Sequence, residues 1–237
     1  MSALFLSRAR LRRDVPAAAL WRELAPRDDD KRVATSHRLV WTLFADSPDR
    51  ERDFLWREAA PGTFYFLSTR APEDRHNLFE IDPPKLFAPQ LRVGDVLQFS
   101  LRANATVARR PQGASGERVR GKPSDVVMDA LYRIPKGRER EAARRDAIGT
   151  AGLNWLRARG QGSGFRLPED ATDDGAGCLT SYRVVQLDHR NTRMRLGVLD
   201  FEGKLLVDEP ARFLEAIARG FGRGKAFGCG LMMIRRV

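Results

Sequence analysis

The residues best suited to chemistry lie in a glycine-rich run near the C-terminus, between Arg219 and Leu231. Glycine lets a backbone adopt positive φ and lets a phosphate approach main-chain N–H groups without a Cβ in the way. The run therefore predicts a loop that grips a polyanion through Gly222, Arg223, Gly224 and Lys225. The alternative is a tight helix-to-strand connection whose glycines allow close packing. The glycines of the run are Gly220, Gly222, Gly224, Gly228 and Gly230.

The two common nucleotide-binding motifs do not fit this run. A Walker A loop needs Gly, four residues, then Gly-Lys-Ser/Thr, but Ala226 follows Gly224-Lys225 and Arg219 stands where the first glycine is required. The dinucleotide pattern fails because Phe227 replaces its last glycine. Both motifs also open a helix after a strand, whereas this run follows a predicted helix. A nucleic-acid backbone is therefore the favoured polyanion.

The positive charge is concentrated in two blocks of the chain. The net charge is +11, with +1 over residues 1–101, +7 over 102–145, −2 over 146–211 and +5 over 212–237. Localised basic segments are the electrostatic footprint of nucleic-acid binding. The alternative is that the charge only reflects a proteome rich in basic residues. That alternative does not explain well why the first 101 residues are nearly neutral. The predicted RNA contacts of the first block are Arg102, Arg109, Arg110, Arg118, Arg120 and Lys122.

Composition narrows the class of protein. A chain of 237 residues with 42% hydrophobic residues can bury a sizeable core. No apolar run approaches the roughly 18–20 residues of a membrane span. The two cysteines, Cys178 and Cys229, are far apart and lack metal-ligand neighbours. We therefore expect a cytoplasmic protein with no membrane contact, no disulfide scaffold, no bound metal and no cofactor.

The first part of the chain alternates strands and helices. Residues 3–11, 54–56, 63–69 and 78–81 read as strands, and residues 14–24 as a short helix. A better-defined helix begins at Thr35 or Ser36, after a charged turn over 26–32, and carries His37 on its apolar stripe. A weak helix is expected after Pro72. This order predicts a ferredoxin-like domain over residues 1–88.

Residues 89–237 repeat the same order. Strands are expected at 93–102, 179–187, 193–201, 204–207, with a turn at Glu202-Gly203, and at 231–234. Helices are expected from Ser124 to about Arg133, over 139–159, and over 208–219 with Asp208 as N-cap and Pro210 in its first turn. The fold class is therefore α+β, with two tandem ferredoxin-like (RRM-like) domains.

Several segments in this order resemble a known family. They are Phe99–Asn104 after Val93–Asp95, the Asp200–Gly203 turn, the run Gly220–Leu231, and His37 followed by Leu39–Phe44. The chain resembles the CasE family, the CRISPR repeat-processing endoribonucleases of type I-E Cascade complexes. That resemblance agrees with the fold expected above.

The resemblance implies metal-independent cleavage of repeat hairpins in precursor CRISPR RNA. The ribose 2′-OH attacks the adjacent phosphate, giving a 2′,3′-cyclic phosphate and a 5′-OH. The protein then stays bound to the crRNA hairpin, with other Cascade subunits as partners. His37 matches the family's catalytic histidine, and its side-chain type suits proton transfer near neutral pH.

Two positions depart from the family pattern. Well-known members carry a tyrosine three residues before this histidine and some carry a lysine five residues after it; here these are Ala34 and Thr42. A second acid-base group is therefore not assigned, and the neighbouring candidates are Lys31, Arg32, Ser36 and Arg38. Surface or turn positions are expected for His76 and His189, while Arg190 and Arg193 are expected to contact the RNA stem beside His189.

Two rival functions stay open. The first is a non-catalytic RNA-hairpin-binding subunit with the same fold. It stays possible because Ala34 stands where well-known family members have a tyrosine. The second is a general single-strand RNA-binding module of RRM type, which would stack bases on sheet aromatics. No RNP1-like run appears on a predicted strand.

Overall fold

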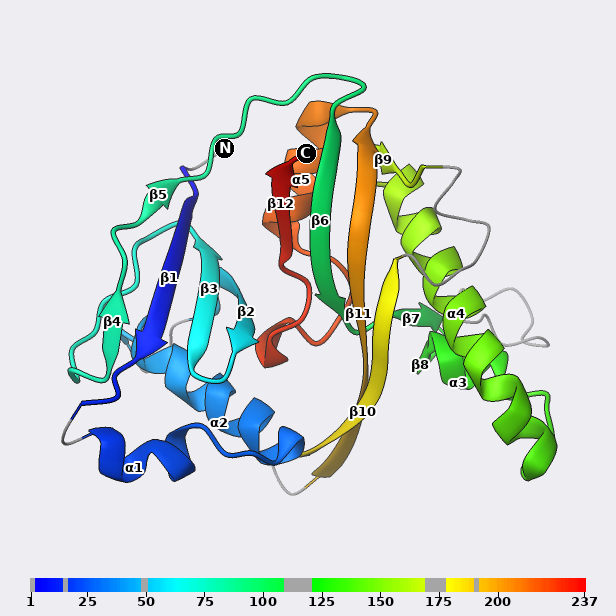
Figure 1. Cartoon of the computed structure of the whole chain (residues 1–237), viewed down its shortest axis with the longest axis horizontal. Helices are drawn as coiled ribbons and strands as arrows, with labels where there is room; N and C mark the ends of the chain where they lie inside the picture. Colours follow the sequence, from blue (N-terminus) through cyan, green and yellow to red (C-terminus); the bar gives the residue numbers. More distant parts are fainter. Residues whose placement is uncertain (1–2, 15–16, 48–50, 109–120, 169–177, 190–191) are drawn as a thin grey trace.

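Two antiparallel sheets lie side by side in the computed structural model of the chain (Figure 1). It describes residues 3–14, 17–47, 51–108, 121–168, 178–189 and 192–237. Among these, no helix is both long and apolar enough to cross a membrane.

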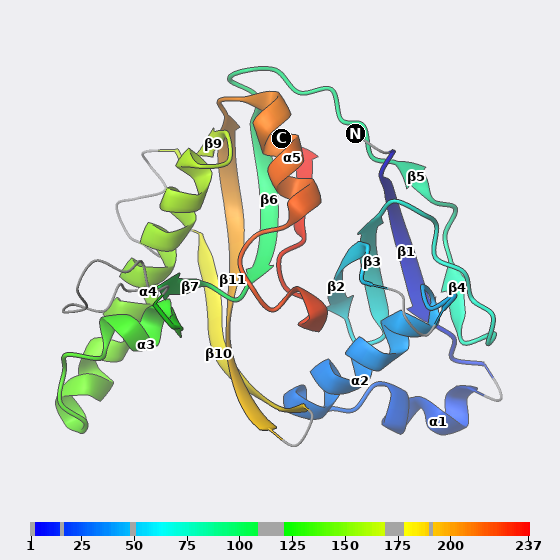
Figure 2. The same cartoon turned by 180° about the vertical axis from the view of Figure 1, so that it is seen from behind.

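The first sheet has the strand order β2-β3-β1-β4, with the short β5 also paired to β1. Strand β1 alternates buried and partly exposed positions, and aromatic residues of β2 and β3 form one buried cluster with Phe44, which follows α2; the strand residues are Phe54, Trp56, Phe64 and Phe66. Helices α1 (Ala17–Leu24) and α2 (Asp29–Thr42) follow β1, and Figure 2 shows α2 in front of this sheet. The strands are β1 Phe5–Leu11, β2 Phe54–Ala60, β3 Thr63–Ser68, β4 Phe79–Ile81 and β5 Lys85–Leu86.

The N-cap of helix α2 lies seven or eight residues before the caps that the sequence pattern predicts. The N-cap is Asp28, whose carboxylate accepts a hydrogen bond from the Lys31 N–H at 2.9 Å. Asp29 and Asp30 occupy the first turn, where negative charge is favourable at a helix N-terminus. The predicted caps Thr35 and Ser36 were therefore wrong, because the charged stretch before them is helical and not a turn.

The weak helix expected after Pro72 is also absent, since residues 69–78 contain only bends and irregular backbone. Asp74 organises this connection instead by accepting hydrogen bonds from the N–H groups of His76 and Phe79.

The second sheet has the order β10-β11-β6-β12, with β9 also paired to β11. In both sheets the first and third long strands are central, which is the arrangement of a ferredoxin-like fold and confirms the predicted α+β class. Helices α4 (Arg138–Gln161) and α5 (Pro210–Arg219) accompany the second sheet. Its strands are β6 Val96–Ala103, β9 Phe165–Arg166, β10 Leu179–His189, β11 Thr192–Val207 and β12 Met232–Arg236.

Strand β11 corrects the expected turn at Glu202-Gly203. It runs without interruption through both residues, because β6 pairs with it continuously from Leu199↔Ala103 to Leu206↔Val96. A small hairpin, β7 (Thr106–Ala108) with β8 (Pro123–Asp125), precedes the short helix α3 (Val126–Ala130).

Two helix caps also differ from the sequence-based expectation. Asp125 caps α3 in place of Ser124, since its carboxylate accepts from the Val127 and Met128 N–H groups. Glu209 is the N-cap residue of α5 in place of Asp208, which forms an ion pair with Arg166.

The two sheets share part of one apolar core. Leu55 and Leu67 of the first sheet belong to the same buried cluster as Leu97, Phe99 and Leu101 of the second. Burying a side chain of this size contributes about 1.5–3 kcal/mol. The division at residues 88 and 89 stays a prediction, although the connector between the sheets passes through this position.

Candidate functional site

His37 contacts the glycine-rich run at Ala226, which lies 189 positions further along the sequence. Its Nδ1 lies 2.7 Å from the carbonyl oxygen of Ala226, and its ring centroid lies 5.2 Å from that of Phe227. Ala226 is the middle residue of a single 3₁₀ turn, η2 (Lys225–Phe227). The fold thus joins the predicted catalytic residue and the predicted anion-binding loop into one site.

Helix α2 reaches this turn because its N-terminal part contacts β10 of the second sheet. The Asp30 carboxylate accepts a hydrogen bond from the Gln186 N–H of β10 at 2.9 Å. One turn further along, Val33 and Ala34 pack against an apolar cluster that includes Val185 and Leu196. His37 follows on the same side of the helix, so the packing of α2 on β10 determines where the imidazole lies.

The contact with Ala226 determines the tautomer of neutral His37. A carbonyl oxygen can only accept a hydrogen bond, so Nδ1 must carry the proton that it donates. The lone pair of the neutral ring is then at Nε2. His37 is thereby prepared to accept a proton at Nε2, as a general base requires.

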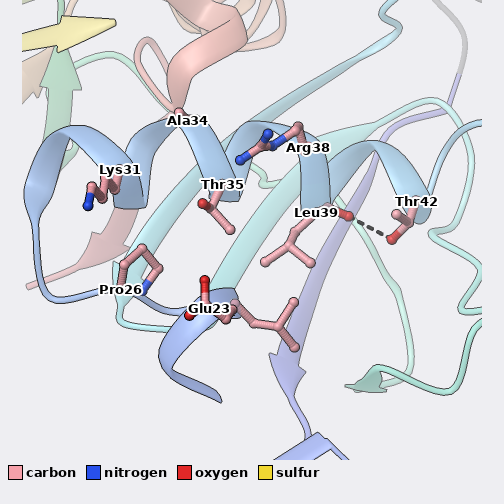
Figure 3. Close-up of a pocket in the computed structure, with 9 residues that line it drawn as sticks. Glu23, Pro26, Lys31, Ala34, Thr35, Arg38, Leu39 and Thr42 are labelled. Atoms are coloured by element: carbon pink, nitrogen blue, oxygen red, sulfur yellow. Dashed lines mark hydrogen bonds between the residues drawn. The ribbon is translucent and has the colours of Figure 1, made fainter. Parts of the chain in front are cut away.

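A hollow of about 540 Å³ runs along the side of α2 that carries Lys31, Thr35 and Arg38 (Figure 3), and His37 is not among the residues that line it. Ala34 and Thr42, the two departures from the family pattern, both line it. Thr42 bonds its own helix, because its hydroxyl donates to the Leu39 carbonyl oxygen at 2.7 Å. Lys31 and Arg38 are exposed cations on the wall of the same hollow.

The other two neighbouring candidates are engaged elsewhere. Arg32 forms ion pairs with Asp29 and, at 3.4 Å, with Glu58. Ser36 is buried. Among the four candidates, Lys31 and Arg38 are therefore the exposed cations, and both line the hollow along α2.

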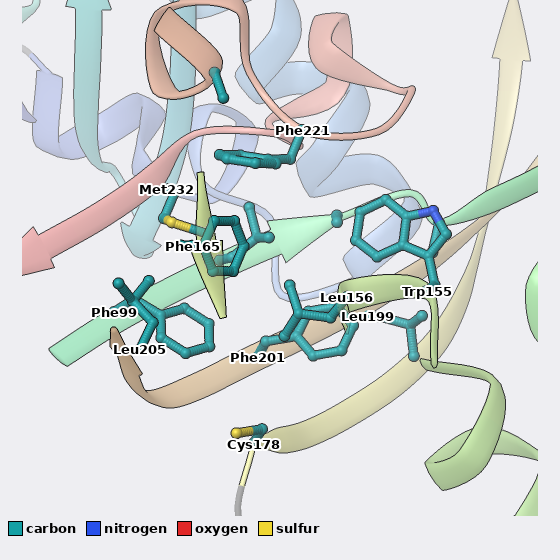
Figure 4. Close-up of a cluster of buried hydrophobic side chains, with 14 of the residues drawn as sticks. Phe99, Trp155, Leu156, Phe165, Cys178, Leu199, Phe201, Leu205, Phe221 and Met232 are labelled. Carbon is teal, nitrogen blue, oxygen red and sulfur yellow. The ribbon is translucent and has the colours of Figure 1, made fainter. Parts of the chain in front are cut away.

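The glycine-rich run is fixed to the protein by close packing. Phe221 is buried against Phe165 in the core of the second domain (Figure 4). A Cβ on Gly222 would come within 2.7 Å of the Asn104 carbonyl oxygen, and one on Gly228 within 3.0 Å of the Trp56 ring. All five glycines have positive φ and close neighbours of this kind: Gly220, Gly222, Gly224, Gly228 and Gly230. Packing, the alternative interpretation of the sequence, therefore accounts for each of them.

The two cations of the run differ in their surroundings. Arg223 is exposed, and its backbone N–H donates to the Asn104 carbonyl oxygen at 3.1 Å. The Lys225 ammonium donates to the Arg219 carbonyl oxygen at 2.6 Å, at the C-terminal end of α5 where positive charge is favourable. Partial burial and the nearby charges of Arg52 and Arg219 lower the pKa of Lys225. An approaching phosphate would relieve that repulsion.

Arg52 is a cation of this region that the sequence pattern did not identify. Burial lowers its pKa, and its Nη1 is buried without a hydrogen-bond partner among the described residues. Arg52 is relevant to this site only because it lies near Lys225 in space, and no local sequence motif predicts that proximity.

Arg102 forms a partly buried ion pair with Asp200 instead of presenting a free cation. Its Nε donates to Asp200 Oδ1 at 2.8 Å, and Arg183 donates to the other oxygen of the same carboxylate at 2.9 Å. Burial acts to lower the pKa of Arg102, but the hydrogen bond and the charge of Asp200 outweigh it and raise that pKa. The Arg102 carbonyl oxygen accepts from the Gly230 N–H at 2.7 Å, so this residue also supports the loop. Its contact with RNA stays a prediction.

The remaining predicted contacts are described only in part. Lys122 is exposed just before β8, and Arg193 lies in β11 opposite Asp188. His76 is exposed in the turn after β3, and His189 is the last residue of β10. Outside the described residues lie Arg109, Arg110, Arg118, Arg120 and Arg190.

Within the described segments, no three His, Cys, Asp or Glu side chains are grouped so that they could hold a metal ion. That cleavage needs no metal stays a prediction.

Comparison with known proteins gives consistent matches. A sequence model described as CRISPR associated protein matches residues 4–236. The CRISPR-associated endoribonuclease Cse3 of Thermus thermophilus is 30% identical over 161 residues, which are 65% of this chain and 63% of that protein. The alignment thus spans less than two thirds of that relative's length.

Two further matches extend over more of the chain. The CRISPR system Cascade subunit CasE of Escherichia coli is 25% identical over 203 residues, covering 84% of this chain and 89% of that protein. A solved structure of the CRISPR endoribonuclease Cse3 bound to a 19-nucleotide RNA superposes with a TM-score of 0.64 at 26% identity. That superposition covers 98% of this chain and 100% of the other.

Proposed function

Because the chain belongs to the CRISPR associated protein family and is similar to its CasE members, we propose that it is a repeat-processing endoribonuclease. It cleaves hairpins in precursor CRISPR RNA and stays bound to the crRNA hairpin, in the cytoplasm, as a subunit of Cascade. The single observation that carries the catalytic part is the His37–Ala226 contact, which puts the lone pair of the imidazole at Nε2.

The proposed reaction is an intramolecular transesterification. Nε2 of His37 takes the proton of the ribose 2′-OH, and the 2′-oxygen attacks the adjacent phosphorus. The bond from phosphorus to the 5′-oxygen then breaks, that oxygen takes up a proton, and the products are a 2′,3′-cyclic phosphate and a 5′-OH. A histidine suits the proton transfer because its ordinary pKa lies near neutrality. No metal ion takes part in the proposed step.

Negative charge on the phosphorane needs a cation nearby. Lys31 and Arg38 are exposed cations on the same helix as His37 and are the residues proposed for that role. Since Ala34 and Thr42 offer no side chain that matches the family's second group, water is proposed to protonate the leaving oxygen. The rate then depends mainly on how well the RNA is positioned.

The RNA backbone is proposed to lie across the glycine-rich run and the basic block that precedes α3. Arg223 is exposed there, and Lys225 with Arg52 provides further positive charge. Double-stranded RNA is recognised mainly through its shape and phosphates, which suits an arginine-rich surface.

The open face of the second sheet argues against the RRM-type rival. The alternation of β6 puts Gln98, Ser100 and Arg102 on that face, and the register of β11 puts Asp200, Glu202 and Lys204 opposite them. None of these six residues is aromatic, so the central strands lack the rings on which an RRM stacks bases.

The non-catalytic rival is favoured by Ala34 and Thr42, and one experiment separates it from the proposal. The protein is incubated with its own repeat RNA in EDTA, and the ends of any product are identified. Cleavage to a cyclic phosphate and a 5′-OH is expected. Uncut RNA that nevertheless binds in preference to an unstructured strand at the same salt concentration would establish the non-catalytic subunit.

A further inference from the structure

Trp56 shares the hydrogen-bond acceptor of His37. Its indole Nε1–H donates to the Ala226 carbonyl oxygen at 3.2 Å, while His37 Nδ1 lies 2.7 Å from the same atom. A carbonyl oxygen has two lone pairs, so these two donors occupy both acceptor directions. Trp56 comes from β2 and His37 from α2, so the oxygen connects two elements of the first domain to the C-terminal loop.

Trp56 also supports the turn that carries this oxygen. Gly224 and Gly228, both left-handed at φ 65° and 77°, flank the turn at its two ends. Gly228 lies directly against the Trp56 ring, where an added Cβ would come within 3.0–3.1 Å of two ring atoms. The ring is only 2% exposed and also packs edge-on against Phe64 at 6.0 Å. Its position is therefore set by the core of the first sheet and not by solvent.

We propose that Trp56 is a positioning residue for His37: by holding the Ala226 carbonyl oxygen, it keeps the imidazole in the tautomer whose proton-accepting lone pair is at Nε2. Trp56 does not touch the RNA in this account and acts only through Ala226. The role in cleavage rests on the proposed function, whereas the effect on the His37 tautomer does not depend on it.

The physical reason lies in how a neutral imidazole chooses its tautomer. The ring nitrogen that finds a fixed acceptor keeps the proton, and the other nitrogen becomes the base. Without the indole N–H, the Ala226 carbonyl has one donor fewer and can rotate away from Nδ1. A larger fraction of the molecules then has the His37 proton on Nε2, and in that tautomer Nε2 cannot accept the 2′-OH proton. One neutral hydrogen bond corresponds to an effect of about two- to tenfold.

The test replaces Trp56 with β-(3-benzothienyl)alanine, in which sulfur takes the place of the indole N–H and the ring keeps nearly the same shape. Trp155 offers a matched control because it is also buried, at 7% exposure, and its Nε1 has no hydrogen-bond partner among the described residues. Each substituted protein is compared with the natural one by ring ¹⁵N NMR of His37, by RNA affinity and by single-turnover cleavage.

The proposal expects the Trp56 replacement to shift the His37 signals toward the Nε2–H tautomer and to slow cleavage about two- to tenfold, with RNA affinity unchanged. The same replacement at Trp155 should change neither. An unchanged tautomer overturns the proposal, and so does a shifted tautomer with an unchanged cleavage rate. If the natural protein does not cut RNA at all, the proposed function fails, and the NMR result alone decides whether Trp56 orients His37.

Discussion

Gly228→Ala tests whether the glycine-rich run is shaped by packing or by a bound phosphate. Gly228 has φ +77°, and left-handed backbone costs a residue with a Cβ about 1–2 kcal/mol. The new methyl group would also press on the Trp56 ring at 3.0 Å, and overpacking a core typically costs about 1–3 kcal/mol. The variant should therefore lose about 2–5 kcal/mol of unfolding free energy.

Gly94→Ala is the matched control for backbone strain. Gly94 has φ +86°, but nothing lies within 4 Å of the Cβ that the substitution would add. Gly94→Ala should therefore lose only the unfolding free energy that backbone strain costs, about 1–2 kcal/mol. Urea unfolding of both variants without RNA measures the difference. If Gly228→Ala unfolds at the midpoint of the natural protein and only its RNA affinity falls, the packing account is wrong and the phosphate-cradle interpretation is right.

Two further predictions concern charged residues. In the native protein burial acts to raise the pKa of Asp200, but the hydrogen bond from Arg102 outweighs it and the pKa is lowered. The resulting stability is present above the unfolded pKa of about 4 and is lost as the pH falls through the folded value. Asp200→Asn should thus lower the unfolding free energy, measured with urea, by about 1–3 kcal/mol at pH 7 and by much less at pH 3. An equal difference between variant and natural protein at both pH values would argue against this ion pair. Arg223→Ala should weaken binding of hairpins of any sequence and reduce the slope of log K against log salt by about 1. Arg212→Ala, which removes an exposed cation already paired with Glu209, is its control, and equal slopes for the two variants would remove Arg223 from the interface.

The regular elements could be predicted because their signals are local. Alternating apolar residues identified β1, β3 and β6, and the apolar stripe identified α2 and α5. The failures occurred where tertiary structure outweighs local preference. Glu202-Gly203 has the composition of a turn, yet it continues β11 because β6 pairs with both residues. The start of α2 was missed because a run of charged residues reads as a loop until Asp28 is recognised as its cap.

The site could be predicted residue by residue but not as an assembly. His37 and the glycine-rich run each carry a recognisable pattern, and the sequence treats them as separate features. Their contact through Ala226 depends on the packing of α2 against β10, which no local pattern encodes. Trp56 and Arg52 were missed for the same reason, since a tryptophan in a strand normally indicates only a core position.

The most direct test of the account is the single-turnover cleavage rate of His37→Ala on the protein's own repeat hairpin in EDTA, with His76→Ala as control. His76 is an exposed turn residue, so its replacement should leave the rate unchanged. Loss of a general acid-base group typically lowers a rate by about 10²–10⁴-fold, and a fall of that size is predicted for His37→Ala with RNA affinity retained. Cleavage by His37→Ala at the rate of the natural protein would contradict the account.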